Sequence, residues 1–299
     1  MPSQESVALV ELIKSQGGLG ALSVEAVRAR TAPAEGAPPL VEGTVTAATV
    51  SGGVPGEFIN APGAEEHRIV LYFHGGGYVM GNSPGHRQFC SRLSAATGAR
   101  VLSVDYRLAP ENPYPAAATD GVFAYQALVE SGFAPGNIAI AGDSAGGGIA
   151  FSVLHQIKDR GLPMPSCAIG ISPWTDLTNS GASMMARADV DPLLTGMALQ
   201  WFANQYVTRD QAKEAFASPL LGDITGFPPL LIQCGTFEVL YDDSARMAEA
   251  AAKAGVSCTF EPYEGQIHVF PVIAPHLPES AEAVARMGAF VKSHALGTT

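Results

Sequence analysis

The chain has 299 residues, with 17 basic against 28 acidic side chains, so its formal net charge is −11. Proteins that bind nucleic acid or an anionic membrane cluster basic side chains, so this balance predicts neither as a partner. Charged residues make up 15% and hydrophobic residues 47% of the sequence, which indicates a large packed core or a homodimer that hides part of its surface.

The first forty residues do not follow the pattern of the rest. They open on the amphipathic MPSQESVALVELIKSQ and end on the Pro/Ala/Gly-rich TAPAEGAPPL. The opening lacks the basic start of a signal peptide, and the apolar stretches are too short for a membrane-spanning helix. The four cysteines (Cys90, Cys167, Cys234 and Cys258) match no zinc or CxxC spacing, so a cytoplasmic, reduced protein is expected.

Short β-rich runs then alternate with helix-length segments. The expected strands cover residues 41–50, 57–61, 68–73, 100–105, 137–142, 167–171, 230–234 and 258–263. The expected helices cover residues 84–97, 115–130, 144–160, 242–255 and 278–294. From the third strand onward the runs are continuously apolar, which is typical of parallel strands buried on both faces. Ser51-Gly52-Gly53 predicts an antiparallel hairpin between the first two strands. The pattern predicts an α/β fold with an eight-stranded, mostly parallel sheet flanked by helices.

A second exception is a long apolar insertion between two strands. An insertion of this length is usually functional, and its many Met, Leu and aromatic residues argue against disorder. We therefore expect a helical cap built from residues 1–40 and 178–225, with the catalytic domain formed by residues 41–177 and 226–299.

The strongest local signal is Gly142-Asp143-Ser144-Ala145-Gly146, which follows an apolar strand and opens a helix-compatible run. This strand–turn–helix setting is typical of a nucleophile elbow, in which the flanking glycines permit a tight turn that exposes the serine. The alternative is a glycine-rich helix start capped by Asp143 or Ser144.

A second glycine-rich turn, His74-Gly75-Gly76-Gly77, follows the third strand. Acyl transfer generates an oxyanion that preorganised donors must meet, and glycine amides allow close approach. We predict the N–H groups of Gly75, Gly76 and Ala145 as the oxyanion hole, with His74 orienting the loop.

The base and acid should follow the later strands at the carboxyl edge of the sheet, where ligands of parallel sheets bind. His155 lies too far down the helix from Ser144 to reach it, so His268 is the predicted base and His276 the second choice. Glu238 comes first after the seventh strand and is the predicted acid. Asp242 and Asp243 remain as alternatives, although a helix-capping role suits them.

These residues resemble the microbial branch of the hormone-sensitive-lipase family, α/β-hydrolase carboxylesterases with a cap. The motifs that carry the resemblance run in family order from about residue 70 to residue 270: HGGG at 74–77, DYRLAPE at 105–111, GDSAGG at 142–147, SPWTDL at 172–177, DP at 191–192, SPL at 218–220, EVLYDD at 238–243 and GQIHVF at 265–270. Family members carry aspartate or glutamate at the position of Glu238.

The resemblance implies a serine carboxylesterase for short- to medium-chain acyl esters that uses neither metal nor organic cofactor. Ser144 would form the acyl-enzyme, His268 would be the base, and Glu238 would orient it. Pocket candidates, for which ordinary core packing is equally open, are Tyr78, Met80, Trp174, Leu193, Leu194 and Phe202. A receptor-like member without turnover and an amidase or peptidase with the same triad remain the alternatives. The resemblance also implies a dimer surface on the last strand and the C-terminal helix.

Overall fold

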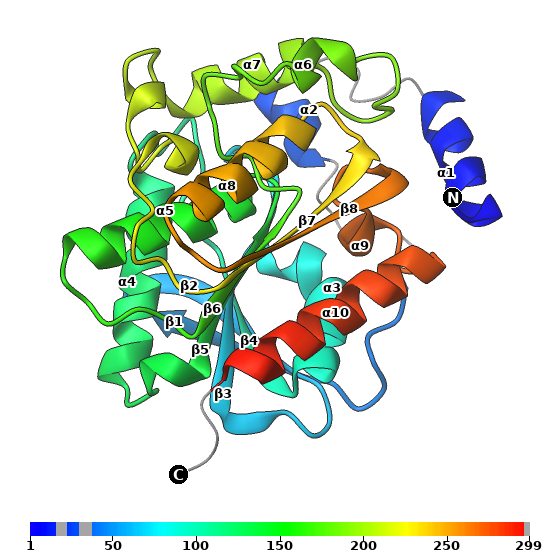
Figure 1. Ribbon diagram of the computed structural model, residues 1–299. Helices are drawn as coiled ribbons and strands as arrows, with labels where there is room; N and C mark the ends of the chain where they lie inside the picture. Colours follow the sequence, from blue (N-terminus) through cyan, green and yellow to red (C-terminus); the bar gives the residue numbers. More distant parts are fainter. Residues whose placement is uncertain (16–22, 30–37, 296–299) are drawn as a thin grey trace.

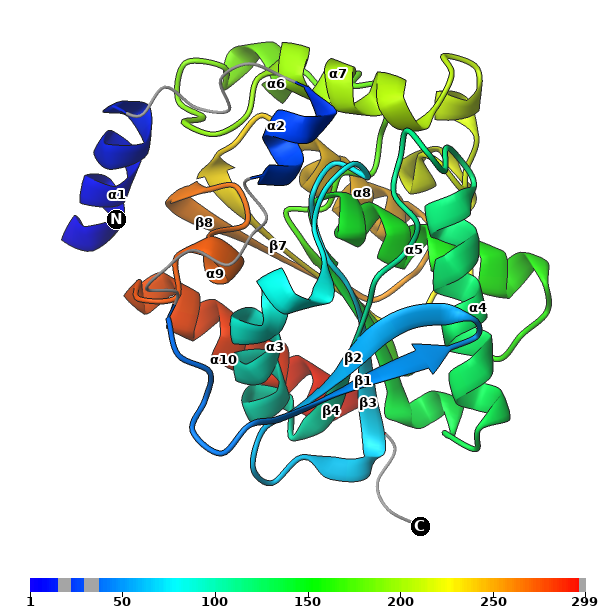
Figure 2. The same cartoon turned by 180° about the vertical axis from the view of Figure 1, so that it is seen from behind.

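The strands form one open sheet with helices packed on both of its faces (Figures 1 and 2). The computed structural model describes residues 1–15, 23–29 and 38–295. Within these residues one eight-stranded sheet forms, in the order β1-β2-β4-β3-β5-β6-β7-β8. Its strands are β1 (Val45–Ser51), β2 (Val54–Asn60), β3 (Glu65–Phe73), β4 (Ala99–Val104), β5 (Ile138–Asp143), β6 (Cys167–Ile171), β7 (Leu230–Phe237) and β8 (Cys258–Ile267).

The predicted hairpin and parallel core are both confirmed. Strand β2 pairs antiparallel with β1 and with β4, whereas every pair from β4 to β8 is parallel. Strands β2 and β3 begin three residues earlier than predicted, and β7 and β8 end three and four residues later. Strand β7 continues to Phe237, and β8 includes 264–267, because Ile267 pairs with Phe237 and the Gly265 N–H donates to Thr236 Oγ1. The sheet therefore delivers Glu238 and His268 directly at two adjacent strand ends.

Helices cover both faces of the sheet. Their bounds are α3 (Ser83–Thr97), α4 (Ala116–Glu130), α5 (Ala145–Asp159), α8 (Tyr241–Lys253), α9 (Phe270–Ile273) and α10 (Pro278–His294). Alternation along β3 separates the two sides, since successive strand residues point to opposite faces. Val70 and Tyr72 join the core under α3 and α10, whereas Leu71 and Phe73 join the core under α4, α5 and α8. Burial on both faces is the reason that the central strands are continuously apolar.

The remaining helices lie beyond the carboxyl ends of the strands. Helices α2 (Val24–Ala29), α6 (Ser183–Ala186) and α7 (Gly196–Tyr206) lie together there, and α1 (Gln4–Ser15) lies at the β8 side (Figure 1). Parts of the expected amino-terminal cap segment, residues 16–22 and 30–37, lie outside the described residues. Among the helices in the described part of the chain, none has the length and apolarity to cross a membrane.

Candidate active site

Ser144 lies on a sharp turn between β5 and α5. Its backbone has φ 54° and ψ −122°, a region that side-chain-bearing residues rarely occupy and that costs conformational energy. The flanking glycines are required by contact. A Cβ at Gly142 would lie 2.2 Å from the carbonyl oxygen of Gly146, and a Cβ at Gly146 would lie 2.1 Å from that of Phe73. The turn therefore requires glycine at both positions, two residues before and two residues after Ser144.

The structure brings the predicted nucleophile, base and acid into one hydrogen-bonded line. His268 Nε2 lies 2.9 Å from Ser144 Oγ, and His268 Nδ1 lies 2.7 Å from Glu238 Oε2. Glu238 is fully buried and His268 is 5% exposed, whereas Ser144 is half-buried and reachable. A carboxylate on Nδ1 fixes the tautomer in which Nε2 accepts the serine proton.

The other carboxylate oxygen of Glu238 is also occupied. Glu238 Oε1 accepts the Gly235 N–H at 2.6 Å and the Ser172 hydroxyl at 2.9 Å. Ser172 Oγ in turn accepts the Val269 N–H at 3.0 Å, so one serine joins the acid to the residue after the base. The sequence reasoning did not select Ser172. Its position directly after β6 is the signal that could have found it.

The surroundings of His268 favour its protonated form. Burial lowers the pKa of His268, but the hydrogen bond and charge of Glu238, followed by the charges of Asp191 and Asp143, raise it above the ordinary histidine value in total. An imidazolium at this position is therefore stabilised by the charges of three carboxylates.

The alternative acids have other partners. Asp242 Oδ2 accepts the Ser183 N–H at 2.9 Å. Asp243 is fully buried, and its Oδ2 accepts the N–H groups of Thr175 and Asp176 at 2.7 and 2.8 Å. Burial raises the pKa of Asp243 to about 8. Both aspartates hold neighbouring loops in place, and the contact with His268 Nδ1 belongs to Glu238.

The other histidines downstream of Ser144 do not meet it. His276 is exposed, and His294 Nδ1 lies 2.8 Å from the carbonyl oxygen of Phe290 in its own helix. His155 Nε2 lies 2.9 Å from the carbonyl oxygen of Pro219. Burial lowers the pKa of His155, which suits a neutral histidine in a packing role.

The structure corrects one predicted oxyanion donor. The Gly75 N–H donates to Asp143 Oδ1 at 2.8 Å, so its hydrogen is used inside the protein, whereas a donor to substrate was expected. Among the described residues, the N–H groups of Gly76 and Gly77 have no protein acceptor. The same holds for Ala145, which opens α5, where first-turn amides lack intrahelical partners. The free amides of this turn are thus displaced by one residue from the prediction.

His74 has the orienting environment that was expected of it. Its Nδ1 lies 2.8 Å from the carbonyl oxygen of Gly75, and its ring stacks on Tyr106 with centroids 4.3 Å apart. Burial and the nearby His86 lower the pKa of His74 to about 3, so the ring is neutral. The ring of His86 lies 5.5 Å from that of His74, centroid to centroid, and its Nε2 lies 3.6 Å from Asp143 Oδ1.

The predicted pocket residues fall into different environments. Tyr78 and Trp174 are 2% and 0% exposed and pack in the main core, where Tyr78 stacks on Tyr206 of α7 with centroids 4.0 Å apart. Phe202 packs against the turn 74–77, which we call the oxyanion turn after its predicted role, since a Cβ on Gly77 would meet the Phe202 ring at 2.4 Å. Core packing accounts for the first two, and the Phe202 ring contacts the turn at Gly77.

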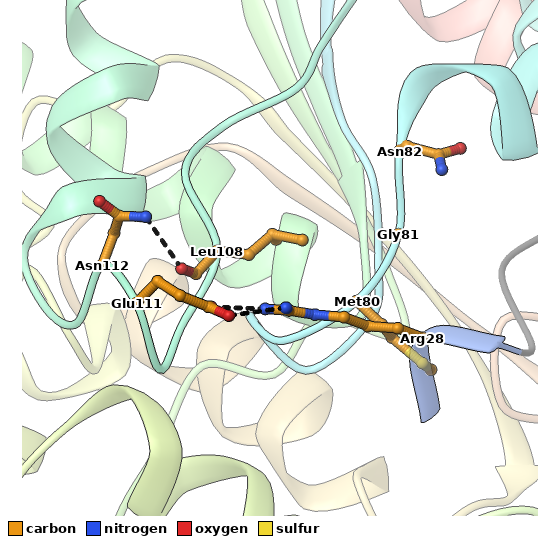
Figure 3. Close-up of a pocket in the computed structure, with 7 residues that line it drawn as sticks. All are labelled: Arg28, Met80, Gly81, Asn82, Leu108, Glu111 and Asn112. Carbon is orange, nitrogen blue, oxygen red and sulfur yellow. Dashed lines mark hydrogen bonds and ion pairs between the residues drawn. The ribbon is translucent and has the colours of Figure 1, made fainter. Parts of the chain in front are cut away.

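The remaining candidates are also separated. Leu194 packs on the main core, whereas Leu193 joins a small cluster with Val10 of α1 and Ile267 of β8. Met80 lines a cavity of about 440 Å³ together with Arg28, Gly81, Asn82, Leu108, Glu111 and Asn112 (Figure 3).

One side chain crosses this cavity. Arg28 of α2 donates to the carbonyl oxygens of Val79 and Ala109 at 2.9 and 3.0 Å and forms a two-pronged ion pair with Glu111. Figure 3 shows the guanidinium facing the Glu111 carboxylate. This arginine ties the amino-terminal segment to the chain that follows the oxyanion turn.

Comparisons with known proteins agree with this geometry. A family model described as alpha/beta hydrolase fold matches residues 70–272. The chain is 44% identical over 232 residues to an acetyl-hydrolase of Streptomyces hygroscopicus, covering 78% of each chain. It is similar to a crystallised esterase of the bacterial hormone-sensitive lipase family, with TM-score 0.94 and 36% identity over 99% of this chain and 100% of the other. It also resembles EstE5 soaked with p-nitrophenyl butyrate, with TM-score 0.93 and 38% identity over 98% and 99% of the two chains.

Proposed function

The chain belongs to the hormone-sensitive-lipase family of alpha/beta hydrolases and is a carboxylic ester hydrolase, and from this premise we propose that Ser144, His268 and Glu238 are its catalytic triad. The observation that carries the proposal is the continuous hydrogen-bonded line, with 2.9 Å from Ser144 Oγ to His268 Nε2 and 2.7 Å from Nδ1 to Glu238 Oε2.

The triad acts in two acyl-transfer steps. His268 Nε2 takes the hydroxyl proton of Ser144 as the oxygen attacks the ester carbonyl, and it returns that proton to the leaving alcohol. The acyl-enzyme then reacts with water by the same route, which releases the acid and restores the serine. Glu238 keeps its charge facing Nδ1 throughout and stabilises the imidazolium.

We propose the N–H groups of Gly76, Gly77 and Ala145 as the oxyanion hole. Amides without an internal acceptor are available to the developing oxyanion, and donors held in place before the reaction need no reorganisation. Asp143 supports this arrangement by accepting the Gly75 N–H at 2.8 Å, which holds the turn beside the nucleophile.

The proposed substrates are small esters of short- to medium-chain acids. An acetyl-hydrolase and a structure soaked with p-nitrophenyl butyrate among the similar proteins support short acyl groups. Residues 1–40 and 178–225 are proposed as one cap, because α2 of the first segment lies together with α6 and α7 of the second beyond the carboxyl ends of the strands. Phe202 and Met80, which adjoin the oxyanion turn, are the proposed pocket residues with the best structural support.

The remaining predictions concern the whole protein. The four cysteines are free, which suits the expected cytoplasmic location, and that location stays a prediction. The homodimer also stays a prediction. The proposed surface is the edge strand β8 with α10.

A serine-reactive organophosphonate tests the nucleophile. We expect one equivalent to add its mass to Ser144 and to abolish hydrolysis of p-nitrophenyl butyrate. Ser144→Ala should lose both labelling and at least about 10⁴-fold of kcat. Substantial turnover by this variant would refute the assignment. Labelling without turnover of any ester or anilide would instead indicate the receptor-like alternative, and faster cleavage of anilides than of esters would indicate an amidase. A series of p-nitrophenyl esters then measures the preferred acyl length.

A further inference from the structure

The cap segment from α6 to the start of α7 is hydrogen-bonded directly to the loop that carries the proposed acid. Arg187 donates to the carbonyl oxygen of Thr236. The Ser183 hydroxyl donates to the carbonyl oxygen of Val239 at 2.5 Å and accepts the Asp242 N–H at 3.0 Å. These bonds bracket Glu238 on both sides, so the acid's loop is held partly by the cap.

Asp191 is the central side chain of this contact. It is 8% exposed, and its Oδ1 accepts the N–H groups of Leu193 and Leu194 at 2.8 and 2.9 Å. Its Oδ2 accepts the N–H of Val239, the residue directly after Glu238, at 2.8 Å. One buried carboxylate therefore fixes two peptides of the cap turn and one peptide of the acid's loop.

The three bonds define what Asp191 can do. Two of them shape the cap turn on which Leu193 and Leu194 lie. The third fixes the peptide that leads out of Glu238, so a shift of the cap turn would be passed to the carboxylate that orients His268. A displacement of about 1 Å in such a constellation lowers the rate of catalysis strongly.

Asp191 also contributes charge. The charged groups that act on His268 are Glu238, Asp191 and Asp143, and each raises the pKa of the imidazole. Arg187, a cation of the same segment, has its guanidinium carbon 3.9 Å from the centroid of the Tyr241 ring. Burial raises the pKa of Asp191 itself, although its three amides and His268 oppose that rise.

From this geometry we propose that Asp191 is a positioning residue for the catalytic triad, which couples the cap turn to Glu238 and whose charge favours the imidazolium of His268. The inference rests on the proposed function, because it presupposes that Glu238 and His268 are the acid and the base.

Asp191→Asn tests the proposal. Asparagine has nearly the same shape, but its single oxygen cannot serve both sides, and its NH₂ group cannot accept from an amide. With p-nitrophenyl butyrate we expect kcat to fall about tenfold while KM stays within about twofold, since the bond acts on the triad rather than on substrate. The acidic limb of the pH profile of kcat/KM should move to lower pH by about half a unit, because the variant lacks a negative charge that raises the pKa of His268.

Two matched variants separate position and charge from general loosening. Asp189→Asn removes an exposed carboxylate from the same segment and should leave kcat and the pH profile unchanged. Ser183→Ala breaks a bond to the same residue, Val239, without removing charge, and should lower the melting temperature but leave the acidic limb in place.

Each outcome decides the proposal. Wild-type kcat and pH profile in Asp191→Asn would overturn it, and so would an equal pH shift in Asp189→Asn or Ser183→Ala. If Asp191→Asn does not fold, Asp191→Glu keeps the charge and displaces it, so kcat should fall while the acidic limb stays. An unchanged kcat there would also overturn the proposal. Organophosphonate labelling of Ser144 in each variant shows that the proposed function stands, so the two failures are distinguishable.

Discussion

Asp143, the residue before the nucleophile, is expected to support the oxyanion turn and the fold together. It is 3% exposed, and its Oδ1 accepts the Gly75 N–H at 2.8 Å and the Tyr72 hydroxyl at 2.5 Å. His86 Nε2 lies 3.6 Å from the same oxygen. Burial raises the pKa of Asp143, but His86 and the hydrogen bonds outweigh that effect and keep the carboxylate ionised. Asp143→Ala would leave two buried donors without an acceptor.

The size of the effect follows from those two donors. A hydrogen bond to a charged acceptor contributes about 1.5–3 kcal/mol, so two such bonds amount to about 3–6 kcal/mol. Removing the carboxylate also removes the cost of burying its charge, which offsets part of this loss. We expect a net loss of about 2–4 kcal/mol in the free energy of unfolding. For a chain of this size, that corresponds to a fall of about 3–6 °C in melting temperature. Because the freed Gly75 peptide no longer holds the turn, kcat should fall by about 10²-fold.

Tyr72→Phe is the matched control, since it removes one donor and leaves the bond between Asp143 and Gly75 intact. We expect it to cost about 1.5–3 kcal/mol in unfolding free energy and to keep kcat within about twofold of wild type. Denaturant unfolding and turnover of p-nitrophenyl butyrate measure both quantities. If Asp143→Ala loses no more kcat than Tyr72→Phe, the carboxylate does not hold the oxyanion turn and the reasoning fails.

Three further predictions follow from the site. Glu238→Ala should reduce kcat by about 10³-fold or more, whereas Asp242→Ala should reduce it less than about tenfold, and the reverse ranking would move the acid. The pKa of His268 is raised above about 6.5, and only the neutral imidazole accepts the serine proton, so kcat/KM should fall with pH through that raised pKa. Glu238→Gln should move this fall to lower pH, and an unchanged pH profile would contradict the coupling. Gly77 has φ +61°, and Gly77→Ala would place a Cβ 2.4 Å from the ring of Phe202, so the change should cost about 2–4 kcal/mol in unfolding free energy. The double variant Gly77→Ala with Phe202→Ala should cost less than the two single changes summed, and strict additivity would count against the clash.

The sequence was sufficient for the elements whose cause is local. Apolar runs bounded by turns predict the third to the eighth strand, because a strand buried on both faces needs apolar residues throughout. The spacing Gly142-x-Ser144-x-Gly146 predicts the nucleophile turn, because neighbouring backbone leaves no room for a Cβ at either glycine. The order of strands along the chain predicts Glu238 as the acid and His268 as the base, because parallel strands present their carboxyl ends at one edge of the sheet.

Strand ends were less predictable. Residues 264–266 lie outside the predicted strand 258–263, but they belong to β8, in which Ile267 pairs with Phe237 at the end of β7. That pairing is a contact between segments thirty positions apart, and no local pattern encodes it. It determines how closely the acid and the base follow their strands.

Only the tertiary structure decided how the polar groups around the triad are shared. Gly75 was a plausible oxyanion donor in sequence, but its N–H belongs to Asp143, 68 positions away. Ser172 bonds to Val269 across 97 positions, and Asp191 accepts from Val239 across 48. A backbone N–H has one hydrogen to donate, and the acceptor that lies nearest to it depends on how distant segments pack. The sequence therefore determined which residues can do the chemistry, and the packing of the cap and the loops determined which amides and carboxylates are left to support it.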